Sequence, residues 1–358
     1  MKQKNQKPYT RTLHKTHLTP TRVLGCLACA AALPMTVANV HADAANAASG
    51  ASSAPPASNA TAPAPSAPKT DMLFNLDVAN QYVTPRGMMV RNQGVTFQPL
   101  ILGFVNAYGG GDGFINSVTL VGGMWNDIGT SDVSINGSPH SSPGTAWTEI
   151  DPIGGFSVGF LKNFTLDVTA TAFVEQIEDI GTSAHMDFKL SYNDTSVINL
   201  DGFGFHPYVE FWQEVSGKAT DAQLPDKLYK EGYYNVAPSN QKYLAPGESF
   251  YIQTGIDPTY VLKNGIKLEA PVDFLLPNQR FYGQYYGPSS TLGIWSVGGK
   301  VTVPMNFMPE GYGHWGFHFG AKYMYFEDNN LYNLNYFNDP GHPVRNTCLL
   351  YAGVSVFF

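Results

Sequence analysis

The chain ends on LLYAGVSVFF, residues 349–358, and this stretch decides the fold. Every second residue of this stretch, starting at Leu350, is apolar: Leu350, Ala352, Val354, Val356 and Phe358. Successive side chains of a β-strand point to opposite faces, so the spacing predicts a strand with one continuous apolar face. The other face carries Tyr351, Ser355 and Phe357.

The same period of two recurs from residue 71 onward, most clearly at 164–174, 185–192, 266–274 and 314–325. In each segment apolar side chains alternate with polar or small ones, as in strands with two different faces. We expect about twelve strands of similar length, an even number that suits a barrel. Their approximate ranges are 73–84, 95–108, 115–126, 147–160, 164–174, 184–193, 205–215, 249–262, 266–275, 291–304, 313–326 and 347–358.

The connections between these strands alternate in length. The long ones are 85–94, 126–146, 175–183, 216–248, 276–290 and 327–346. The short ones are 109–114, 161–163, 194–204, 263–265 and 305–312. Membrane barrels have this rhythm, because their periplasmic turns are short and their outer loops long. Lipid cannot hydrogen-bond backbone groups, so a membrane sheet must close on itself.

We therefore predict an all-β fold over 71–358: a transmembrane antiparallel up-and-down β-barrel of about 12 strands, preceded by a disordered N-terminal tail. The alternative is a soluble β-sandwich or jelly roll, which also alternates but gives no reason for the loop rhythm. Six prolines fall inside or near the ends of predicted strands, where proline removes a ladder donor. We expect bulges or shifted boundaries at these positions: Pro99, Pro152, Pro207, Pro258, Pro271 and Pro304.

The N-terminal segment 1–42 has the pattern of a signal peptide. Six basic residues and no acid precede an apolar run, and small residues follow, with cleavage expected after Ala42. A membrane anchor and a lipoprotein box at Cys26 are the alternatives. Residues 43–70 are almost wholly Ala, Pro, Ser and small polar residues, which predicts a disordered periplasmic linker.

Removing the signal peptide leaves 15 basic against 28 acidic residues, a net charge of −13. Binding of nucleic acid is therefore not expected, because it needs a clustered basic surface. Cys348 is then the one cysteine left of the three in the chain, so no internal disulfide or cysteine metal site is expected.

The segment YVTPRGMMVRNQGVTFQPLILGF, residues 82–104, resembles the first hairpin of the TorF-like porins, which share a barrel type with the Tsx-like channels. Trp125 before a long connection, then Glu149 and Asp151, is similar to the same group, as is the last strand. Thr84 and Pro85 depart from the pattern, since the family usually has an aromatic residue before the arginine. The resemblance implies a passive channel for small solutes with no known substrate.

The polar faces of the predicted strands supply the candidate site residues. Acids gather on the inner face of the fourth to seventh strands, and lysines on the inner face of later ones. They would either make a transverse field across a water-filled pore or pair with one another and fill a narrow interior. The candidates for the pore lining or its constriction are Arg86, Glu149, Asp151, Asp167, Asp187, Glu210, Lys267, Lys300 and Lys322.

Enzymatic chemistry is not expected. Histidines are available, but no spacing links a nucleophile, a base and an orienting acid, and His314 and His318 complete no metal-ligand set. No cofactor or metal is predicted. Tyr229, Tyr233 and Tyr234 could stack on sugars or nucleosides, or simply pack within their loop.

The sequence thus favours a Gram-negative outer-membrane channel, porin-like, for passive diffusion of small hydrophilic solutes. The alternatives are a non-conducting structural or adhesive barrel and an outer-membrane barrel hydrolase. Expected partners are outer-membrane lipid and lipopolysaccharide, the barrel-assembly machinery acting through the strand that ends at Phe358, and the solutes themselves.

Overall fold

The computed structural model describes residues 69–109, 113–130, 134–135, 138–139, 146–175, 182–198, 200, 202–217, 248–283, 287–338 and 344–358. The predicted signal peptide lies outside these residues, and so does the predicted linker except for its last two residues. Lys69 and Thr70 belong to the first strand, where they pair with Asn106 and Val105. The barrel therefore begins two residues earlier than the composition alone indicated.

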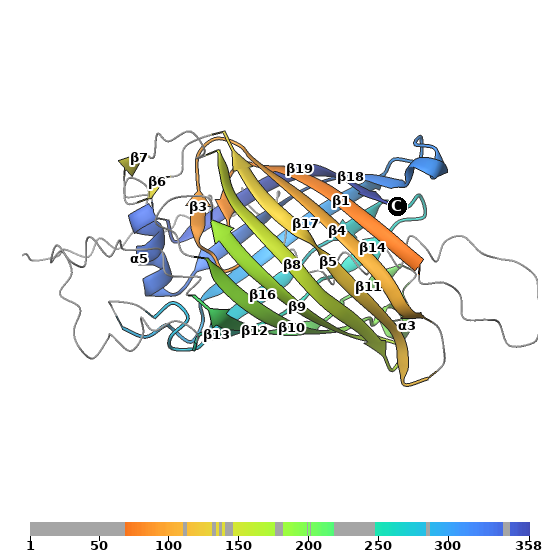
Figure 1. Ribbon diagram of the computed structural model, residues 1–358, viewed down its shortest axis with the longest axis horizontal. Coiled ribbons are helices and arrows are strands. Elements are labelled where there is room, and N and C mark those ends of the chain that lie inside the picture. The colour runs from red at the N-terminus through yellow and green to blue at the C-terminus, as the bar shows by residue number, and fades with distance from the viewer. Residues whose placement is uncertain are drawn as a thin grey trace, which may run out of the picture.

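Fifteen strand segments form one antiparallel sheet (Figure 1). Three of these segments are short and continue the line of a longer segment next to them in the chain. The described residues therefore form twelve strands around the barrel, each of which we call a stave. The staves are β1 (Lys69–Ala79), β4 (Thr96–Gly109), β5 (Ile115–Gly129), β8 (Trp147–Phe160), β9 (Phe164–Glu175), β10 (Ser183–Tyr192), β11 (Phe203–Gly204) with β12 (Tyr208–Ser216), β13 (Phe250–Ile256) with β14 (Thr259–Val261), β15 (Lys267–Glu269) with β16 (Val272–Pro277), β17 (Ile294–Pro304), β18 (His314–Phe326) and β19 (Asn346–Phe357).

The sheet closes because β1 pairs with both the second and the last stave. Asn75 of β1 is opposite Leu100 of β4 on one side and opposite Ser355 of β19 on the other. Closure leaves no free strand edge, which is the condition for a sheet to lie in lipid. All twelve predicted strands are confirmed, and so is the closed barrel.

Prolines break the strands themselves at three of the six positions named in the sequence analysis, and they interrupt the pairing with one neighbour at Pro99 and Pro152. Pro258 separates β13 from β14, Pro271 separates β15 from β16, and Pro207 lies between β11 and β12. At Pro152, inside β8, the pairing with β9 skips from Ile150 to Ile153. The reason is that proline has no N–H to donate to the neighbouring stave.

The two faces of the barrel have opposite chemistry. In β19, Leu350 is 45% exposed, whereas Leu349 and Tyr351 on either side are 7% and 5% exposed. The same holds around the wall: Met72, Ile101, Leu120 and Phe274 are exposed on the outside, while most buried polar side chains point inward. A soluble protein has the reverse arrangement, so this surface is built to face lipid.

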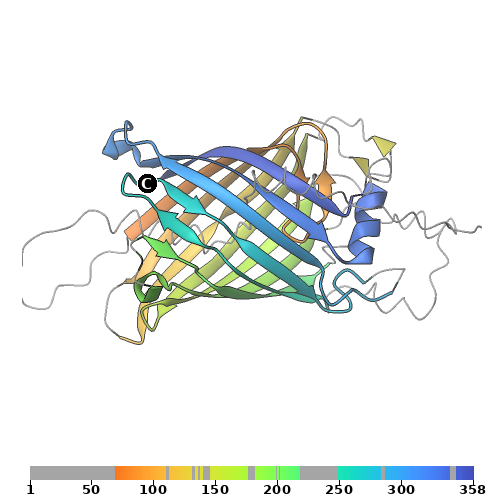
Figure 2. The same cartoon turned by 180° about the vertical axis from the view of Figure 1, so that it is seen from behind.

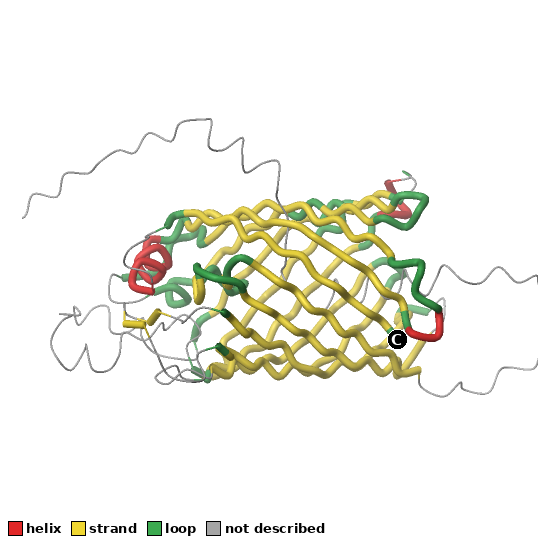
Figure 3. The backbone as a smooth tube through the Cα atoms, turned by 90° about the horizontal axis from the view of Figure 1, so that it is seen from above, coloured by secondary structure: helices red, strands yellow, loops and turns green. Residues whose placement is uncertain are grey.

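The connections gather at two ends, and the views from opposite sides agree (Figures 1 and 2). One end holds the described parts of the long connections, with the hairpin β2 (Tyr82–Val83) and β3 (Met89–Arg91), the hairpin β6 (Ser134–Ile135) and β7 (Ser138–Pro139), and the helix α5 (Asn329–Asn338). The other end holds the C-terminus and the short turns, with α3 (Thr195–Ile198) and the 3-10 turn η2 (Glu310–Tyr312). Figure 3 shows the helical segments lying only at these ends. None of the described helices is long and apolar enough to cross a membrane.

Candidate functional site

The inner wall of the barrel carries the acids that the sequence predicted there. Glu149 and Asp151 lie on β8, Asp167 on β9, Asp187 on β10 and Glu210 on β12, so they occupy four consecutive staves. Four of the five side chains are at most 5% exposed, and Asp187 is half-buried. These burial values agree with the period-two pattern, because the pairing register aligns the inner faces of neighbouring strands; that these acids line a pore stays a prediction.

Strand register joins these acids to a lysine that the sequence analysis did not select. Lys189 of β10 is opposite Asp167 of β9 and Glu210 of β12. Its ammonium lies 4.2 Å from the centre of the Tyr208 ring, and both carboxylates act on its charge. Lys189 shares the inner face with Asp187, two positions away, so strand parity alone could have found it.

The later staves do not carry a separate positive face. Lys267 lies 3.1 Å and Lys300 3.5 Å from Glu269, and Lys322 lies 3.2 Å from Asp273. Glu269 lies on the same stave as Lys267 and on a stave next to that of Lys300, whereas Asp273 and Lys322 lie on the two staves that flank β17. The pairing hypothesis therefore fits these three lysines better than a field running across the lumen.

A further buried pair joins the two staves on either side of β19. His318 of β18 and Asp77 of β1 approach to 2.5 Å, and the Tyr351 ring of β19 lies beside the histidine. His314, four positions earlier on the same face, is exposed. Among the described residues, no three His, Cys, Asp or Glu side chains form a group that could hold a metal ion.

The hairpin β2–β3 folds into the end of the barrel that holds α5 and β6–β7, which we call the outer end (Figure 1). The sequence analysis did not predict this inward fold. Its two ends are tied to the wall: the Tyr82 hydroxyl donates to Glu149 at 2.5 Å, and Arg91 lies 3.7 Å from Asp127. Asp127 also accepts hydrogen bonds from Thr96 and Thr148. The hairpin is therefore part of the inner wall rather than an outward loop.

The tip of the hairpin is hydrogen-bonded to two other connections at the same end of the barrel. The Tyr282 hydroxyl donates to the Arg86 carbonyl at 2.6 Å, and burial raises the pKa of this phenol well above its usual value, so it remains a donor. Asn335 of α5 accepts from the Met89 N–H and donates to the Gly87 carbonyl. Gly87 has φ of +82°, a left-handed conformation that favours glycine.

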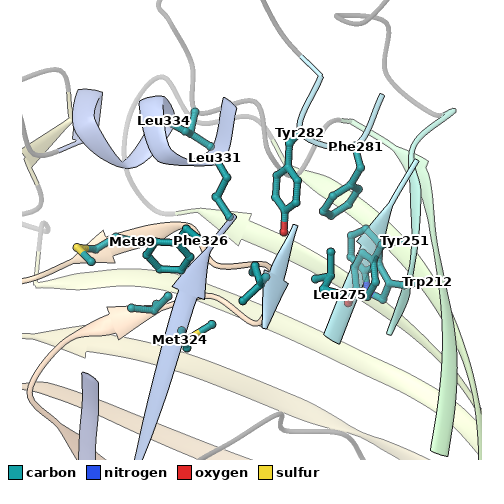
Figure 4. Close-up of a cluster of buried hydrophobic side chains, with 12 residues drawn as sticks. Met89, Trp212, Tyr251, Leu275, Phe281, Tyr282, Met324, Phe326, Leu331 and Leu334 are labelled. Atoms are coloured by element: carbon teal, nitrogen blue, oxygen red, sulfur yellow. The ribbon is translucent and has the colours of Figure 1, made fainter. Parts of the chain in front are cut away.

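An apolar cluster surrounds the hairpin tip at this end (Figure 4). Leu331 and Leu334 of α5 and Phe281 and Tyr282 of the connection 278–293 pack with side chains of the wall. Asp328 fixes the start of α5, because one of its carboxylate oxygens accepts from the N–H groups of Asn330 and Leu331. The cluster comprises Val83, Met89, Trp212, Tyr251, Leu275, Phe281, Tyr282, Ile294, Met324, Phe326, Leu331 and Leu334.

Arg86 therefore lies inside the barrel, 3% exposed, at the level of this cluster. The sequence suggested a place at the mouth or constriction but left its strand parity open, since it lies in a turn. The loop tyrosines Tyr229, Tyr233 and Tyr234 lie outside the described residues.

No protein-family model and no curated protein matches the chain. Solved structures that resemble it are membrane barrels at low identity. The β-domain of the Bordetella autotransporter BrkA has 10% identity over 80% of this chain and 98% of its own, with a TM-score of 0.39. The porin NanC has 9% identity over 80% and 99%, with a TM-score of 0.35. The COG4313 outer-membrane channel of Pseudomonas putida F1 has 9% identity over 83% and 97%, with a TM-score of 0.39.

Similarity this distant assigns no family, so the resemblance to the TorF-like porins stays a prediction. The barrel itself rests on this chain's own strand pairing, in which β1 closes against β19.

Proposed function

We propose that the protein is a channel of the Gram-negative outer membrane through which small hydrophilic solutes diffuse passively. One observation carries the proposal: among the described residues, the barrel is apolar outside and lined inside by ionisable side chains, several of which are buried carboxylates. The outer surface fits membrane lipid and lipopolysaccharide, and the inner surface fits water and polar solutes.

An unpartnered carboxylate oxygen indicates a hydrated interior. Glu210 Oε2 is buried by the wall but accepts no hydrogen bond from the described residues. A carboxylate oxygen without a partner costs several kcal/mol in a dry interior, so such groups require water. A water-filled interior is what a diffusion channel needs.

The wall has an excess of negative charge, which supports a preference for cations. Its carboxylates are Asp77, Asp127, Glu149, Asp151, Asp167, Asp187, Glu210, Glu214, Glu269 and Asp273. Its cations are Arg86, Arg91, Lys189, Lys267, Lys300 and Lys322.

Conductance of purified, refolded protein in a planar bilayer tests the proposal. We expect discrete current steps and, across a salt gradient, a reversal potential of the sign that cation preference gives. Replacing an inner acid, as in Glu210→Gln, should reduce that preference, whereas Glu327→Gln, exposed in an outer connection, should not. Absence of steps at every voltage would refute the channel and leave the barrel intact.

A closed structural barrel is the second candidate, and the apolar cluster at the outer end favours it. In a closed barrel the hairpin and the cluster would block all current, and a current would appear only after they were removed. A hydrolase would instead turn over phospholipid or peptide substrates and lose that turnover when a rim histidine is replaced.

A further inference from the structure

The guanidinium of Arg86 occupies a recess made by three side chains of the inner wall. Its central carbon lies 3.8 Å from the centre of the Phe173 ring of β9 and 5.5 Å from that of Trp212 of β12. Its Nη1 atom lies 3.3 Å from Nδ1 of His185, on the intervening stave β10. The hairpin thus inserts a planar cation between rings that belong to the wall.

The recess does not depend on Arg86 for its shape. The His185 ring lies 4.2 Å from the Phe173 ring and 3.8 Å from the Trp212 ring, measured between centres. Trp212 also stacks on Tyr251 at 4.9 Å, and Phe281 meets both rings edge-on (Figure 4). Because these rings pack on one another and are held by paired strands, we expect the recess to persist without the arginine.

The charges around the recess favour a cation. Within the part of the chain that the structure describes, no carboxylate forms an ion pair with Arg86, and its Nε donates no hydrogen bond. The Arg86 charge nevertheless acts on the Glu149 carboxylate. Aromatic ring faces attract cations through the ring quadrupole, and proteins use them to bind organic cations.

We propose that this recess is a binding site for small planar organic cations of the guanidinium type, and that Arg86 is its tethered occupant. A free cation would take the same place against Phe173 and Trp212 when the hairpin carries no arginine. The inference rests on the proposed function, because the ligand must be one of the solutes that enter the barrel.

Complementation by guanidinium chloride tests the proposal. In Arg86→Ala the emptied recess should bind guanidinium at low millimolar concentration, seen as a change in tryptophan fluorescence that equal NaCl does not produce. We expect the half-saturating concentration to be at least about tenfold lower than for the unaltered chain, in which Arg86 competes. Guanidinium should also reduce the current through Arg86→Ala in bilayers.

Two variants serve as matched controls. Arg86→Met fills the recess with an apolar chain of similar length, and should not respond to guanidinium. Arg91→Ala removes the other arginine of the hairpin, which pairs with Asp127 and not with the rings, and should respond no more than the unaltered chain. Folding of each variant is checked by its mobility in unboiled detergent gels.

An Arg86→Ala protein that responds no more strongly than Arg86→Met would overturn the proposal and leave the rings as mere packing. Should Arg86→Ala fold poorly, guanidinium added during refolding must raise the folded fraction above the NaCl control, and no such rise would equally overturn it. Loss of current steps in every variant, with the fluorescence response intact, would refute the channel but not the binding site.

Discussion

At the residue scale, Glu149 shows how one buried carboxylate links the hairpin to the wall. It is fully buried on β8, and its Oε2 accepts the hydroxyl of Tyr82 from β2. A hydrogen bond to a charged acceptor contributes more than one between neutral groups, and breaking it leaves the carboxylate oxygen unsatisfied. The contact therefore joins two parts of the chain 67 residues apart.

We predict that Tyr82→Phe lowers the free energy of unfolding by about 1.5–3 kcal/mol, because it deletes this donor and keeps the ring. Urea titration of the refolded protein, read as the folded fraction in unboiled gels, measures the change. Tyr260→Phe is the matched control, since Tyr260 is 42% exposed on the outer face. Equal midpoints for the two variants would show that the Tyr82 contact adds no stability.

Gly87 is a second residue on which the hairpin depends. It adopts φ of +82°, and an added Cβ would lie 2.4 Å from Cδ1 of Ile294, the flexible end of a side chain. We predict that Gly87→Ala destabilises the fold by roughly 1–2 kcal/mol through backbone strain alone. Gly154→Ala is the control, because its Cβ would meet no atom within 4 Å. A thermal transition of Gly87→Ala matching that of Gly154→Ala would contradict the prediction.

At the element scale, the backbone at the end of the last strand and the side chain of its terminal residue have different contacts. The backbone of Phe358 exchanges hydrogen bonds with Met72 of β1, while its side chain is 58% exposed at the end of the short turns. The backbone hydrogen bonds between Phe358 and Met72 therefore do not depend on the phenyl ring of Phe358. The strand keeps its closing role in the barrel whichever side chain stands at its end.

We propose that the assembly machinery recognises the terminal aromatic residue, and we predict that Phe358→Ala refolds normally in detergent but accumulates less in the outer membrane of cells. The membrane fraction and the refolded fraction are compared for the same variant. Phe307→Ala, which removes another exposed aromatic at the same end, should leave both unchanged. Normal membrane levels of Phe358→Ala would argue that the terminal ring is not the recognition element.

At the scale of the whole molecule, the barrel is a closed cylinder with lipid as its outer solvent. Its stability then depends on depth, since a charge facing lipid costs about 2–4 kcal/mol at the midplane and far less near the interface. Ile101, in the middle of β4, is 41% exposed, and Val95, just before the strand, is 38% exposed. The two side chains therefore have similar exposed fractions but differ in their expected depth in the bilayer.

We predict that Ile101→Arg reduces the yield of folded barrel in lipid vesicles much more than Val95→Arg does. The unaltered chain should migrate differently in boiled and unboiled gels, because a closed barrel resists detergent until heated. The ratio of the two bands gives the folded fraction. Similar losses for both variants would mean that this face does not lie in hydrocarbon, and identical migration of boiled and unboiled chain would count against the barrel.

The sequence by itself determined the barrel, its twelve strands and the side of each strand that faces inward. The reason is that a strand in lipid must alternate apolar and polar side chains, so the period of two in 164–174 or 349–358 encodes both the element and its orientation. For the same reason the inner positions of Glu149, Asp167 and Glu210 could be read directly. The resemblance to a porin family included Arg86 in its matching segment but gave no position for its side chain.

Only the tertiary structure decided which charges meet and how the outer end is covered. Lys189 sits between Asp167 and Glu210 because of the register of three strands, and Lys322 meets Asp273 across staves that are not sequence neighbours. The hairpin β2–β3 turns inward because Tyr82, Arg91 and the tip of the turn find partners far along the chain. Such contacts depend on chain closure and loop packing, which no local period records, and they place Arg86 among the rings of the wall.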